Sequence, residues 1–575
     1  MAPSLLIGAH SFLGKIWQLC TPYWKSEEKW QAWGLLAAIV ALTLGNVYLL
    51  VELNDWNRQF FNMLEQKAEG DFLALMQYFC FLAAVFIVVS IYRTYLQQML
   101  EMRWRIWLSR QYLVEWMGNQ VYYRLELENL GTDNPDQRIA EDMRLFTSGT
   151  LSLGLGLMRE CVTLASFVAI LWSVSGPITL FGVEIAGYMV WAALLYAVAG
   201  SVLTHYVGRK LIGLNFHQER LEADFRFNLV RLREHAEGVA LYRGEATEQA
   251  GLLTRLDHIR ENWWALMFYT KRLGAFTIGY SQVAIVFPYF VAGHRYFSGS
   301  ITLGGLSQIA SAFGQVQSSL SWFVDSYTQL ANWRASVDRL LTFHNAVERA
   351  SSETLARQAD RESVAGATGS GSDALDLALP GGRVVLSKAA FELPRGARLL
   401  LTGPSGSGKS TLFRAIAGIW PFAGGRIRVP EGASVLFLPQ KPYIPIGTLR
   451  DALAYPAAGG SFPDAALREV LAKVQLERFA DRLDESGNWS LSMSGGEQQR
   501  LAICRALLHK PDWVFLDEAT SALDEPSEQR AYTVLRDALP QSAIVSIAHR
   551  PTVAAFHEQR IRMEPEGDHM RLATA

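Results

Sequence analysis

Residues 398–418, RLLLTGPSGSGKSTLFRAIAG, combine an apolar run, a glycine-rich loop and the start of a helix. They match the phosphate-binding loop (P-loop) pattern G-x-x-x-x-G-K-[ST]. Backbone N–H groups of such a loop bind phosphates at the helix N-terminus. We expect Lys409 to reach the β- and γ-phosphates, Ser410 to bind Mg²⁺ and Thr411 to add a hydrogen bond. The full set of expected phosphate-binding residues is Gly403, Pro404, Ser405, Gly406, Ser407, Gly408, Lys409, Ser410 and Thr411.

Two adjacent carboxylates follow an apolar strand in residues 511–524, PDWVFLDEATSALD. Asp517, at the end of that strand, is placed to hold Mg²⁺ through water. Glu518 is placed to polarise an attacking water as a general base. Adjacent acids otherwise indicate a solvated turn, but an apolar strand before them and a P-loop in the same chain favour the catalytic interpretation.

Two further polar residues follow predicted strand ends. Gln440, in VLFLPQKPY, stands where it could contact both Mg²⁺ and water. His549, in IVSIAHR, is a candidate contact for the γ-phosphate. A lone histidine is more often structural, so both interpretations of His549 stay open.

The stretch LSMSGGEQQR, residues 491–500, places two glycines between a serine and a polar run. Such a loop ahead of a helix presents backbone N–H groups to an anion. It is a second candidate anion site, about ninety residues after the P-loop.

The elements that position these residues alternate between glycine-punctuated strands and helices over 374–575, which predicts an α/β domain. Before it, residues 344–373 become polar and small, ending in GATGSGSD. We interpret 344–373 as a flexible linker and a domain boundary.

The rest of the chain is apolar enough for a membrane domain, over 31–343. Hydrophobic residues make up 50% of the chain and charged residues only 19%. The net charge of −2 does not favour a nucleic-acid partner. Segments of about 20 residues can cross a bilayer. The predicted spans are 33–53, 72–92, 151–174, 181–207, 273–297 and, more weakly, 303–322.

Basic residues predict the orientation of these spans. The stretches 93–149 and 208–272 are rich in Arg and Lys, and the opposite loops are poor in both. The basic loops and both termini are therefore expected in the cytoplasm. Most of each basic loop should be helix that continues the spans. Residues 1–30 mix aromatic and basic side chains, which predicts an interfacial helix on the inner leaflet.

The weakest span carries polar residues at spacings of three and four, which places them on one helical face. They either bond neighbouring helices together or line an aqueous substrate cavity. Arg159 and Glu160, in the third span, could form a local ion pair. The candidate cavity residues are Gln308, Ser311, Gln315, Ser318 and Trp322.

The P-loop, Gln440, SMSGGEQQR, VFLDE, SALD and AHR occur in this order over about 150 residues. Together they resemble the nucleotide-binding domain of ATP-binding cassette (ABC) transporters. The resemblance implies an exporter-type fold, with a six-helix all-α transmembrane domain fused to an α/β P-loop ATPase domain. It implies ATP and Mg²⁺ as cofactors and a homodimer, because one chain carries one P-loop and one signature.

In the family the signature grips the γ-phosphate of ATP bound to the opposite P-loop. This chain differs from the family pattern in two places. Glu497 stands where the signature usually has glutamine, and no aromatic residue lies between positions 373 and 390 to stack on adenine. Adenine must then pack on apolar groups or on Phe391. The signature residues implied to bind nucleotide are Ser494, Gly495, Gly496 and Gln498, with Asp524 as the D-loop aspartate.

The segments NPDQRIAEDMRLF (134–146) and EADFRFNLVRLREHAEGVALYRGE (222–245) resemble SbmA/BacA-like transporters and the peroxisomal and lysosomal subfamily D. The resemblance implies a bacterial inner-membrane protein that imports hydrophilic cargo, such as cobalamin or peptides, through a large aqueous cavity. One alternative is an exporter or flippase of lipid or fatty acyl-CoA. Another, of a different class, is a membrane-anchored regulatory ATPase.

Overall fold

The computed structural model describes residues 14, 16–128, 134–180, 183–352, 360–364 and 369–574 of the chain. The chain divides into two compact units. The first comprises the chain up to Leu113 together with Asn134–Phe343, and the second comprises Val114–Asp133 and His344–Ala575. The segment 114–133, expected in the membrane domain, thus belongs to the second unit. In that unit Leu127 of α4 (Val121–Glu128) packs against an apolar core cluster.

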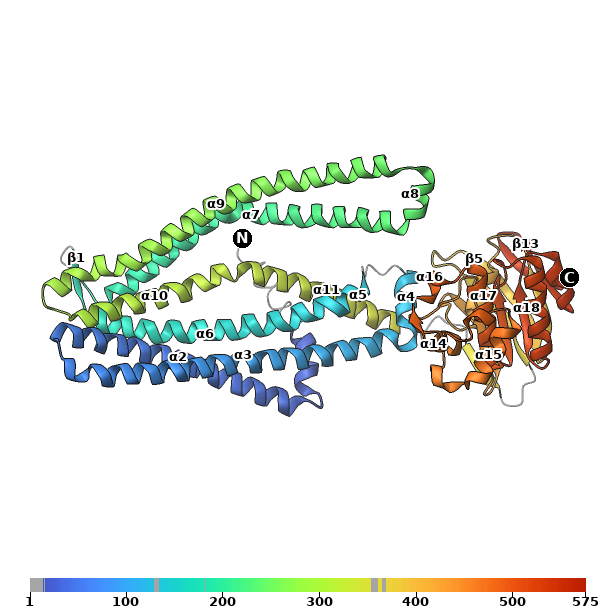
Figure 1. Ribbon diagram of the computed structural model, residues 1–575, viewed down its shortest axis with the longest axis horizontal. Helices are drawn as coiled ribbons and strands as arrows, with labels where there is room; N and C mark the ends of the chain where they lie inside the picture. The colour runs from blue at the N-terminus through green and yellow to red at the C-terminus, as the bar shows by residue number, and fades with distance from the viewer. Residues whose placement is uncertain are drawn as a thin grey trace. The chain divides into compact units, whose positions relative to one another are not determined.

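Long helices build the first unit, as the apolar segments predict (Figure 1). Among the described residues, five helices are long and apolar enough to cross a membrane. The first extends past residue 53 into a loop that is poor in basic residues, and the other four continue as helix into the basic loops. These helices are α2 (Lys29–Gln66), α3 (Phe72–Met117), α6 (Met143–Ser175), α7 (Tyr188–Glu234) and α9 (Glu245–Phe297).

The sixth predicted span forms helix α10 (Leu303–Asp325), but α10 is not among those five helices. Its polar residues lower its hydropathy. Its apolar face is the centre of the helical core: Ile309 and Phe313 are fully buried, in one cluster with Phe167 of α6 and Ala193 of α7. We therefore interpret α10 as a helix held by protein contacts rather than as a span defined by its apolarity.

The fourth predicted span begins later than residue 181. A short antiparallel hairpin comes first, formed by β1 (Ile178–Leu180) and β2 (Val183–Ile185). Gly187 then has φ 62°, and the ring of Trp172 lies 2.4 Å from where a Cβ would be. This left-handed glycine caps α7, so the helix begins at Tyr188.

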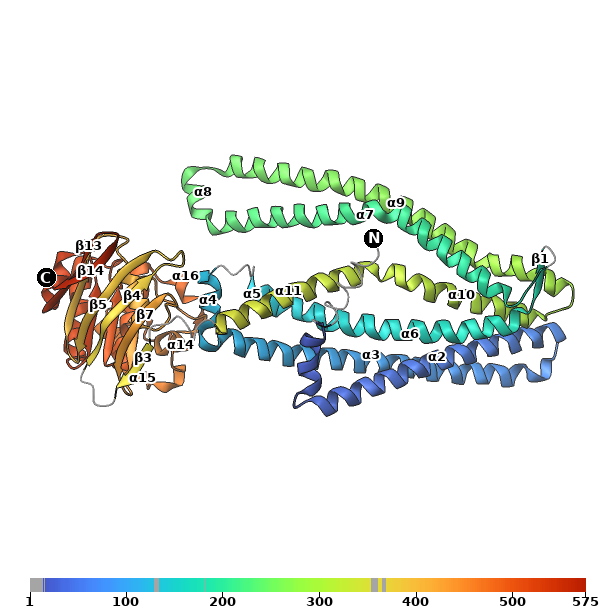
Figure 2. The same ribbon diagram turned by 180° about the vertical axis from the view of Figure 1, so that it is seen from behind.

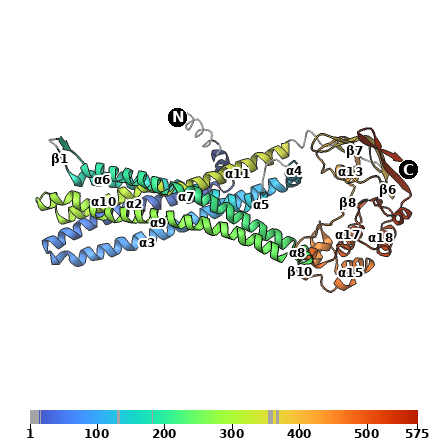
Figure 3. The ribbon, with the colours of Figure 1, turned by 90° about the horizontal axis from the view of Figure 1, so that it is seen from above.

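Helices α7 and α9 lie side by side over most of their length, and α8 (Ala236–Tyr242) joins their ends (Figures 1 and 3). The buried amide of Asn262 fixes their register. Its Nδ2 donates to the carbonyl of Leu214 at 3.1 Å and to Oε1 of Gln218 at 2.8 Å. A buried amide with satisfied partners makes such a pairing specific.

The N-terminal segment is helical over residues 16–25. Tyr23 is fully buried and stacks on Trp104 of α3, with ring centroids 5.7 Å apart. This end of the predicted interfacial helix is therefore anchored to the helical unit, while Trp17 stays exposed. Residues 1–13 of that prediction lie outside the described residues.

The described parts of the predicted linker 344–373 are regular structure. Helix α11 (Tyr327–Ser352) continues through its start and buries Val347. Strand β3 (Asp360–Val364) and the first half of β4 (Gly369–Ala378) occupy its end. Gly369 and Gly371 instead allow close strand approach, because a Cβ at Gly371 would lie 2.6 Å from the carbonyl oxygen of Phe391.

Ten described strands form one sheet in the second unit, in the order β3-β7-β4-β5-β14-β13-β6-β12-β11-β8 (Figure 2). The run β13-β6-β12-β11-β8 is parallel and follows buried apolar strands. Beyond β3 and β4, the strands are β5 (Val384–Pro394), β6 (Arg398–Thr402), β7 (Ala423–Pro430), β8 (Val435–Leu438), β11 (Trp513–Asp517), β12 (Ala543–Ile547), β13 (Gln559–Glu566) and β14 (His569–Thr574).

Helices cover this sheet and bury two apolar clusters against it. One cluster surrounds α17 (Gly495–His509) and α15 (Asp464–Lys473), and the other surrounds α13 (Lys409–Ile416). A second, two-stranded sheet pairs β9 (Gly447–Thr448) with β10 (Ser486–Gly487). The helices are α13 (Lys409–Ile416), α14 (Leu449–Ala454), α15 (Asp464–Lys473), α16 (Trp489–Ser492), α17 (Gly495–His509) and α18 (Glu525–Ala538).

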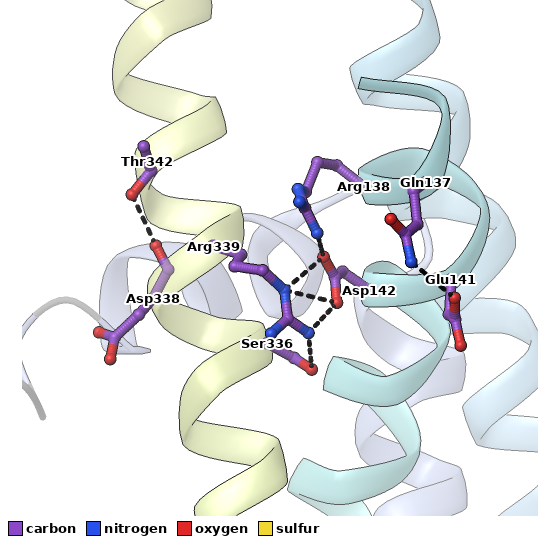
Figure 4. Close-up of polar contacts among 8 residues, drawn as sticks. All are labelled: Gln137, Arg138, Glu141, Asp142, Ser336, Asp338, Arg339 and Thr342. Carbon is purple, nitrogen blue, oxygen red and sulfur yellow. Dashed lines mark hydrogen bonds and ion pairs between the residues drawn. The ribbon is translucent and has the colours of Figure 1, made fainter. Parts of the chain in front are cut away.

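A buried ionic cluster in the first unit joins α6 and α11 where a π-helical turn (Arg138–Asp142) leads into α6 (Figure 4). The side chain of Asp142 is only 3% exposed. Arg339 of α11 donates to both its oxygens, from Nε at 3.0 and 3.2 Å, and Arg138 donates to Oδ2 at 2.5 Å. The two guanidinium groups thus share one carboxylate as their counter-charge.

We predict that Asp142→Ala destabilises the helical unit by about 3 kcal/mol, because it leaves two partly buried guanidinium groups unpaired. Thermal unfolding of the protein in detergent measures this as a lower melting temperature. Asp338→Ala is the matched control, since its pair with Arg334 is 4.0 Å long and exposed. Equal melting temperatures for the two variants would contradict the prediction.

Candidate functional site

The P-loop lies between the end of β6 at Thr402 and the start of α13 at Lys409. Gly406 and Gly408 have φ values of 76° and 93°, in the left-handed region. A Cβ at Gly408 would lie 2.5 Å from Cγ1 of Val385, so only glycine fits there. The loop therefore has the backbone that turns successive N–H groups toward an anion.

Lys409 and Ser410 lie at the start of α13, as the pattern predicts. The ammonium group of Lys409 donates to the carbonyls of Gly403 and Pro404, at 2.9 and 2.8 Å. Burial lowers the pKa of Lys409, opposed by the negative charges of Glu518 and Asp517. The hydroxyl of Ser410 donates to Oδ1 of Asp517 at 2.9 Å.

The Ser410 hydroxyl and the Asp517 carboxylate thus form one oxygen pair, which suits a hard cation such as Mg²⁺. Burial raises the pKa of Asp517, and the neighbouring charge of Glu518 raises it further. A bound cation would reverse that effect by stabilising the carboxylate.

Glu518 is held by both polar residues predicted from the strand ends. Nε2 of Gln440 donates to Oε2 of Glu518 at 3.0 Å, and Nε2 of His549 lies 3.0 Å from Oε1. Glu518 has φ 49°, unusual for a residue with a side chain, while its N–H donates to the carbonyl of Ile547 at 3.0 Å. Strain of this kind is typical of functional positions.

A cavity of about 270 Å³ lies beside the P-loop. Residues 405–411 of the P-loop and helix start form one part of its wall, together with Glu518 and His549. The rest of the wall is formed by Leu379, Arg383 and Val385. Leu379 and Val385 supply apolar surface of the kind an adenine needs without an aromatic partner. Phe391 does not line the cavity and is buried in the core of the second unit.

The residues of the signature lie at the N-terminus of α17. Ser494 caps the helix, and Ser494 and Gly495 are exposed. Gly496 packs close to the loop after Glu518, because a Cβ there would lie 3.2 Å from the carbonyl oxygen of Ala522. None of these three residues lines the cavity beside the P-loop.

Two other predicted nucleotide ligands have contacts within their own loops. Nε2 of Gln498 donates to the carbonyls of Ser490 and Met493, at 2.7 and 3.0 Å, and so holds the segment before the signature. Asp524 is exposed and caps α18, accepting from the N–H of Ser527 at 3.2 Å. Their roles as ligands stay predictions.

Gln499 is a residue of this site that the motifs did not single out. Its buried amide donates from Nε2 to the carbonyl of Gln440 at 3.0 Å and to the hydroxyl of Ser521 at 3.3 Å. Its Oε1 accepts from the N–H of Ala522 at 2.9 Å. One side chain thus joins the signature helix to the Gln440 loop and to the loop after Glu518.

Arg550 and Glu528 provide a second connection that the sequence did not reveal. Arg550 follows His549, and its Nη1 donates to the carbonyl of Leu523 at 2.7 Å. Glu528 is buried on α18 and accepts from Thr520 at 2.7 Å and from Arg550 at 3.4 Å. Glu528 and Arg550 are 22 residues apart and belong to no motif of fixed spacing, so no sequence signal indicated this pair.

The candidate cavity residues of α10 divide between burial and exposure. Gln308 is buried and its Oε1 has no hydrogen-bond partner among the described residues, and Trp322 packs over Gly156 of α6. Ser318 is exposed, and Ser311 and Gln315 are half-buried. Residues near the candidates in sequence form hydrogen bonds to α6 instead. Ser319 of α10 donates to Glu160 at 2.8 Å, and Gln329 of α11 donates to Ser152 at 2.7 Å.

Comparison with known proteins gives this arrangement its class. Residues 19–297 match the family "ABC transporter transmembrane region 2", and residues 386–521 match the family "ABC transporter". The "inner membrane ABC transporter ATP-binding protein YddA" of Escherichia coli is 36% identical, covering 93% of this chain and 94% of that protein. The chloroplastic "ABC transporter D family member 2" of Arabidopsis thaliana is 34% identical, covering 96% and 86%.

The solved structure of a bacterial Atm1-family ABC exporter with ATP bound is similar in fold, with a TM-score of 0.69 over 95% of both chains at 19% identity. The chain therefore belongs to the ABC transporter family and is related to its D subfamily. It is a membrane protein of the exporter-type fold that binds ATP and couples its hydrolysis to transport.

We predict that Gln499→Ala lowers the rate of ATP hydrolysis by about tenfold, because the N–H of Ala522 loses its partner and the two loops lose their connection. Binding of a fluorescent ATP analogue should stay unchanged. Gln529→Ala, at an exposed position of α18, is the control for general effects of the substitution. Equal hydrolysis rates for the two variants would show that Gln499 does not act on the site.

Proposed function

We propose that the protein is a homodimeric transporter that hydrolyses ATP at sites shared between two copies and imports hydrophilic cargo. The observation that carries the ATPase assignment is the position of Glu518 beside the P-loop. Gln440 and His549 each lie 3.0 Å from one of its carboxylate oxygens. A carboxylate oriented on both sides is suited to align and deprotonate an attacking water.

The other residues have complementary roles in this proposal. The P-loop N–H groups and Lys409 bind the β- and γ-phosphates, and Thr411 adds a hydrogen bond. Ser410, Asp517 and Gln440 hold Mg²⁺, which neutralises phosphate charge when bound. His549 orients Glu518 and contacts the γ-phosphate. Leu379 and Val385 receive the adenine.

The position of the signature supports the requirement for a second copy. The cavity beside the P-loop is lined by residues of the P-loop, of the Leu379–Val385 stretch and of the strand ends, and no signature residue lines it. Ser494 and Gly495 are exposed at the N-terminus of a 15-residue helix, which favours an anion. In the proposal they meet the γ-phosphate at Lys409 of the second copy, and Asp524 acts at the same interface.

The hydrophilic cargo is supported by charge inside a predicted span. Glu160 of α6 is buried, and its two oxygens accept from Nε of Arg159 at 2.8 Å and from Ser319 of α10 at 2.8 Å. Ionisable groups within a span face protein or water and are typical of a substrate path. We place the polar face of α10, including Gln308, Ser311, Gln315, Ser318 and Trp322, along this path.

The proposed location is the bacterial inner membrane, with both termini in the cytoplasm. The name of the Escherichia coli relative supports the membrane, and the basic loops support the orientation. The resemblance of residues 134–146 and 222–245 to SbmA/BacA-like transporters supports the import of molecules such as cobalamin or peptides.

We predict that Glu518→Gln lowers ATP turnover at least a hundredfold and leaves ATP bound, because the amide cannot take a proton from water. Steady-state ATPase assays and the retention of radiolabelled ATP after gel filtration measure the two effects. Glu469→Gln, on the exposed face of α15, is the control. ATPase activity retained by Glu518→Gln would refute its role as the base.

We predict ATP-dependent uptake of radiolabelled cobalamin by proteoliposomes that contain the protein, and no uptake with the Glu518→Gln variant. Long-chain acyl-CoA is tested in parallel. Movement of acyl-CoA alone would favour the exporter or flippase. Hydrolysis that moves neither compound, nor a labelled peptide, would favour a regulatory ATPase.

A further inference from the structure

The acid in the signature has a defined structural role. The N–H and the hydroxyl of Ser494 both donate to Oε2 of Glu497, at 2.9 and 3.0 Å. The N–H of Glu497 in turn lies 3.4 Å from the Ser494 hydroxyl oxygen. This reciprocal capping box fixes the first turn of α17 and the rotamer of the serine.

The same contact has an electrostatic cost for ATP hydrolysis. Glu497 is only 8% exposed, so its charge is poorly screened by water. In the proposed function, Ser494 meets the γ-phosphate of the second copy. A bare carboxylate bonded to that hydroxyl would repel the phosphate and would compete with it for the hydroxyl proton.

Arg478 offsets this charge. Its guanidinium forms an ion pair with Oε1 of Glu497, the oxygen that Ser494 does not use. The guanidinium also lies over the ring of Phe479, 4.7 Å from the centroid, and Phe479 is buried. The cation is therefore held at the carboxylate from a neighbouring segment of the chain.

Arg500 is the second cation near Glu497, but its Nη1 donates to the carbonyl of Gln475 at 3.2 Å. Burial acts to raise the pKa of Glu497, while the hydrogen bonds from Ser494 and the charges of Arg478 and Arg500 lower it, with a net lowering. The charge of the Glu497 carboxylate is therefore one that Arg478 offsets directly, through its ion pair.

We propose that Arg478 is a positioning residue for ATP hydrolysis: it neutralises Glu497 and so allows the Ser494 hydroxyl to approach the γ-phosphate bound by a second copy. The proposal rests on the shared site of the proposed function. Arg478 would then offset the negative charge of Glu497, although Arg478 itself lies outside the signature motif.

The test compares ATP hydrolysis by Arg478→Ala with that of the unaltered protein. We expect kcat/KM for ATP to fall about tenfold, equivalent to about 1.4 kcal/mol. Binding of a fluorescent ATP analogue to the P-loop should not change. The loss should be smaller at high salt, where added ions screen the carboxylate. The matched control is Arg468→Ala, which removes an exposed arginine 3.6 Å from Asp481.

The double variant Arg478→Ala with Glu497→Gln separates charge from packing. Glutamine keeps an oxygen that accepts from Ser494 but carries no charge, so the double variant should recover most of the lost kcat/KM. A double variant as impaired as Arg478→Ala would overturn the proposal, because Arg478 would then act through its packing on Phe479. Unchanged kcat/KM in Arg478→Ala would overturn it as well.

Failure of the proposed function gives a different result. If Ser494→Ala hydrolyses ATP as fast as the unaltered protein, the shared site itself is wrong and Arg478 has no role in hydrolysis. If Ser494→Ala loses hydrolysis while Arg478→Ala does not, only the inference about Arg478 fails.

Discussion

The site depends on one carboxylate that the backbone holds in an unfavourable conformation. Glu518 has φ 49° directly after β11, and its carboxylate is shared between Gln440 and His549. The parallel register of the sheet makes this possible, because β8 and β12 flank β11 on its two sides. The residues that follow these strands meet at one edge, where the P-loop after β6 also lies. The strand order of the sheet therefore brings the candidate catalytic and phosphate-binding residues together at one edge.

The signature is tied to this edge through hydrogen bonds of buried groups. Gln499 contacts the carbonyl of Gln440 and the N–H of Ala522, and Gly496 allows Ala522 to approach. A displacement of the signature helix would therefore disturb the loops on both sides of Glu518. Arg550 adds a connection from the His549 loop to Leu523. In the proposed dimer, this network is a physical route by which ATP bound between two copies affects the position of Glu518.

Much of the fold and of the nucleotide site could be predicted from the sequence, because short patterns encode them. The P-loop, the two carboxylates and the strand-end residues Gln440 and His549 have fixed spacings to apolar strands. The helices were also visible as long apolar runs. The contacts of Gln499 and Arg478 were not predictable in this way, since each joins segments distant in sequence and neither has a spacing rule.

Composition was a poorer guide to two segments. Residues 369–373 looked flexible because they are small and polar, yet Gly371 is required by the close approach of β4 to β5. Helix α10 looked like a weak span, but its apolar residues are the centre of the helical core. Composition shows how polar a segment is, but it does not determine whether protein, lipid or water surrounds that segment.

The central claim is that each ATP is hydrolysed between the P-loop of one copy and the signature of another. Mixing two inactive variants, Lys409→Ala and Ser494→Ala, tests it most directly. A mixed dimer contains one intact site, made by the P-loop of the Ser494→Ala chain and the signature of the Lys409→Ala chain. Co-expressed chains should hydrolyse ATP although neither variant does so alone. A mixed dimer, purified through two different tags, that remains as inactive as its parents would contradict it.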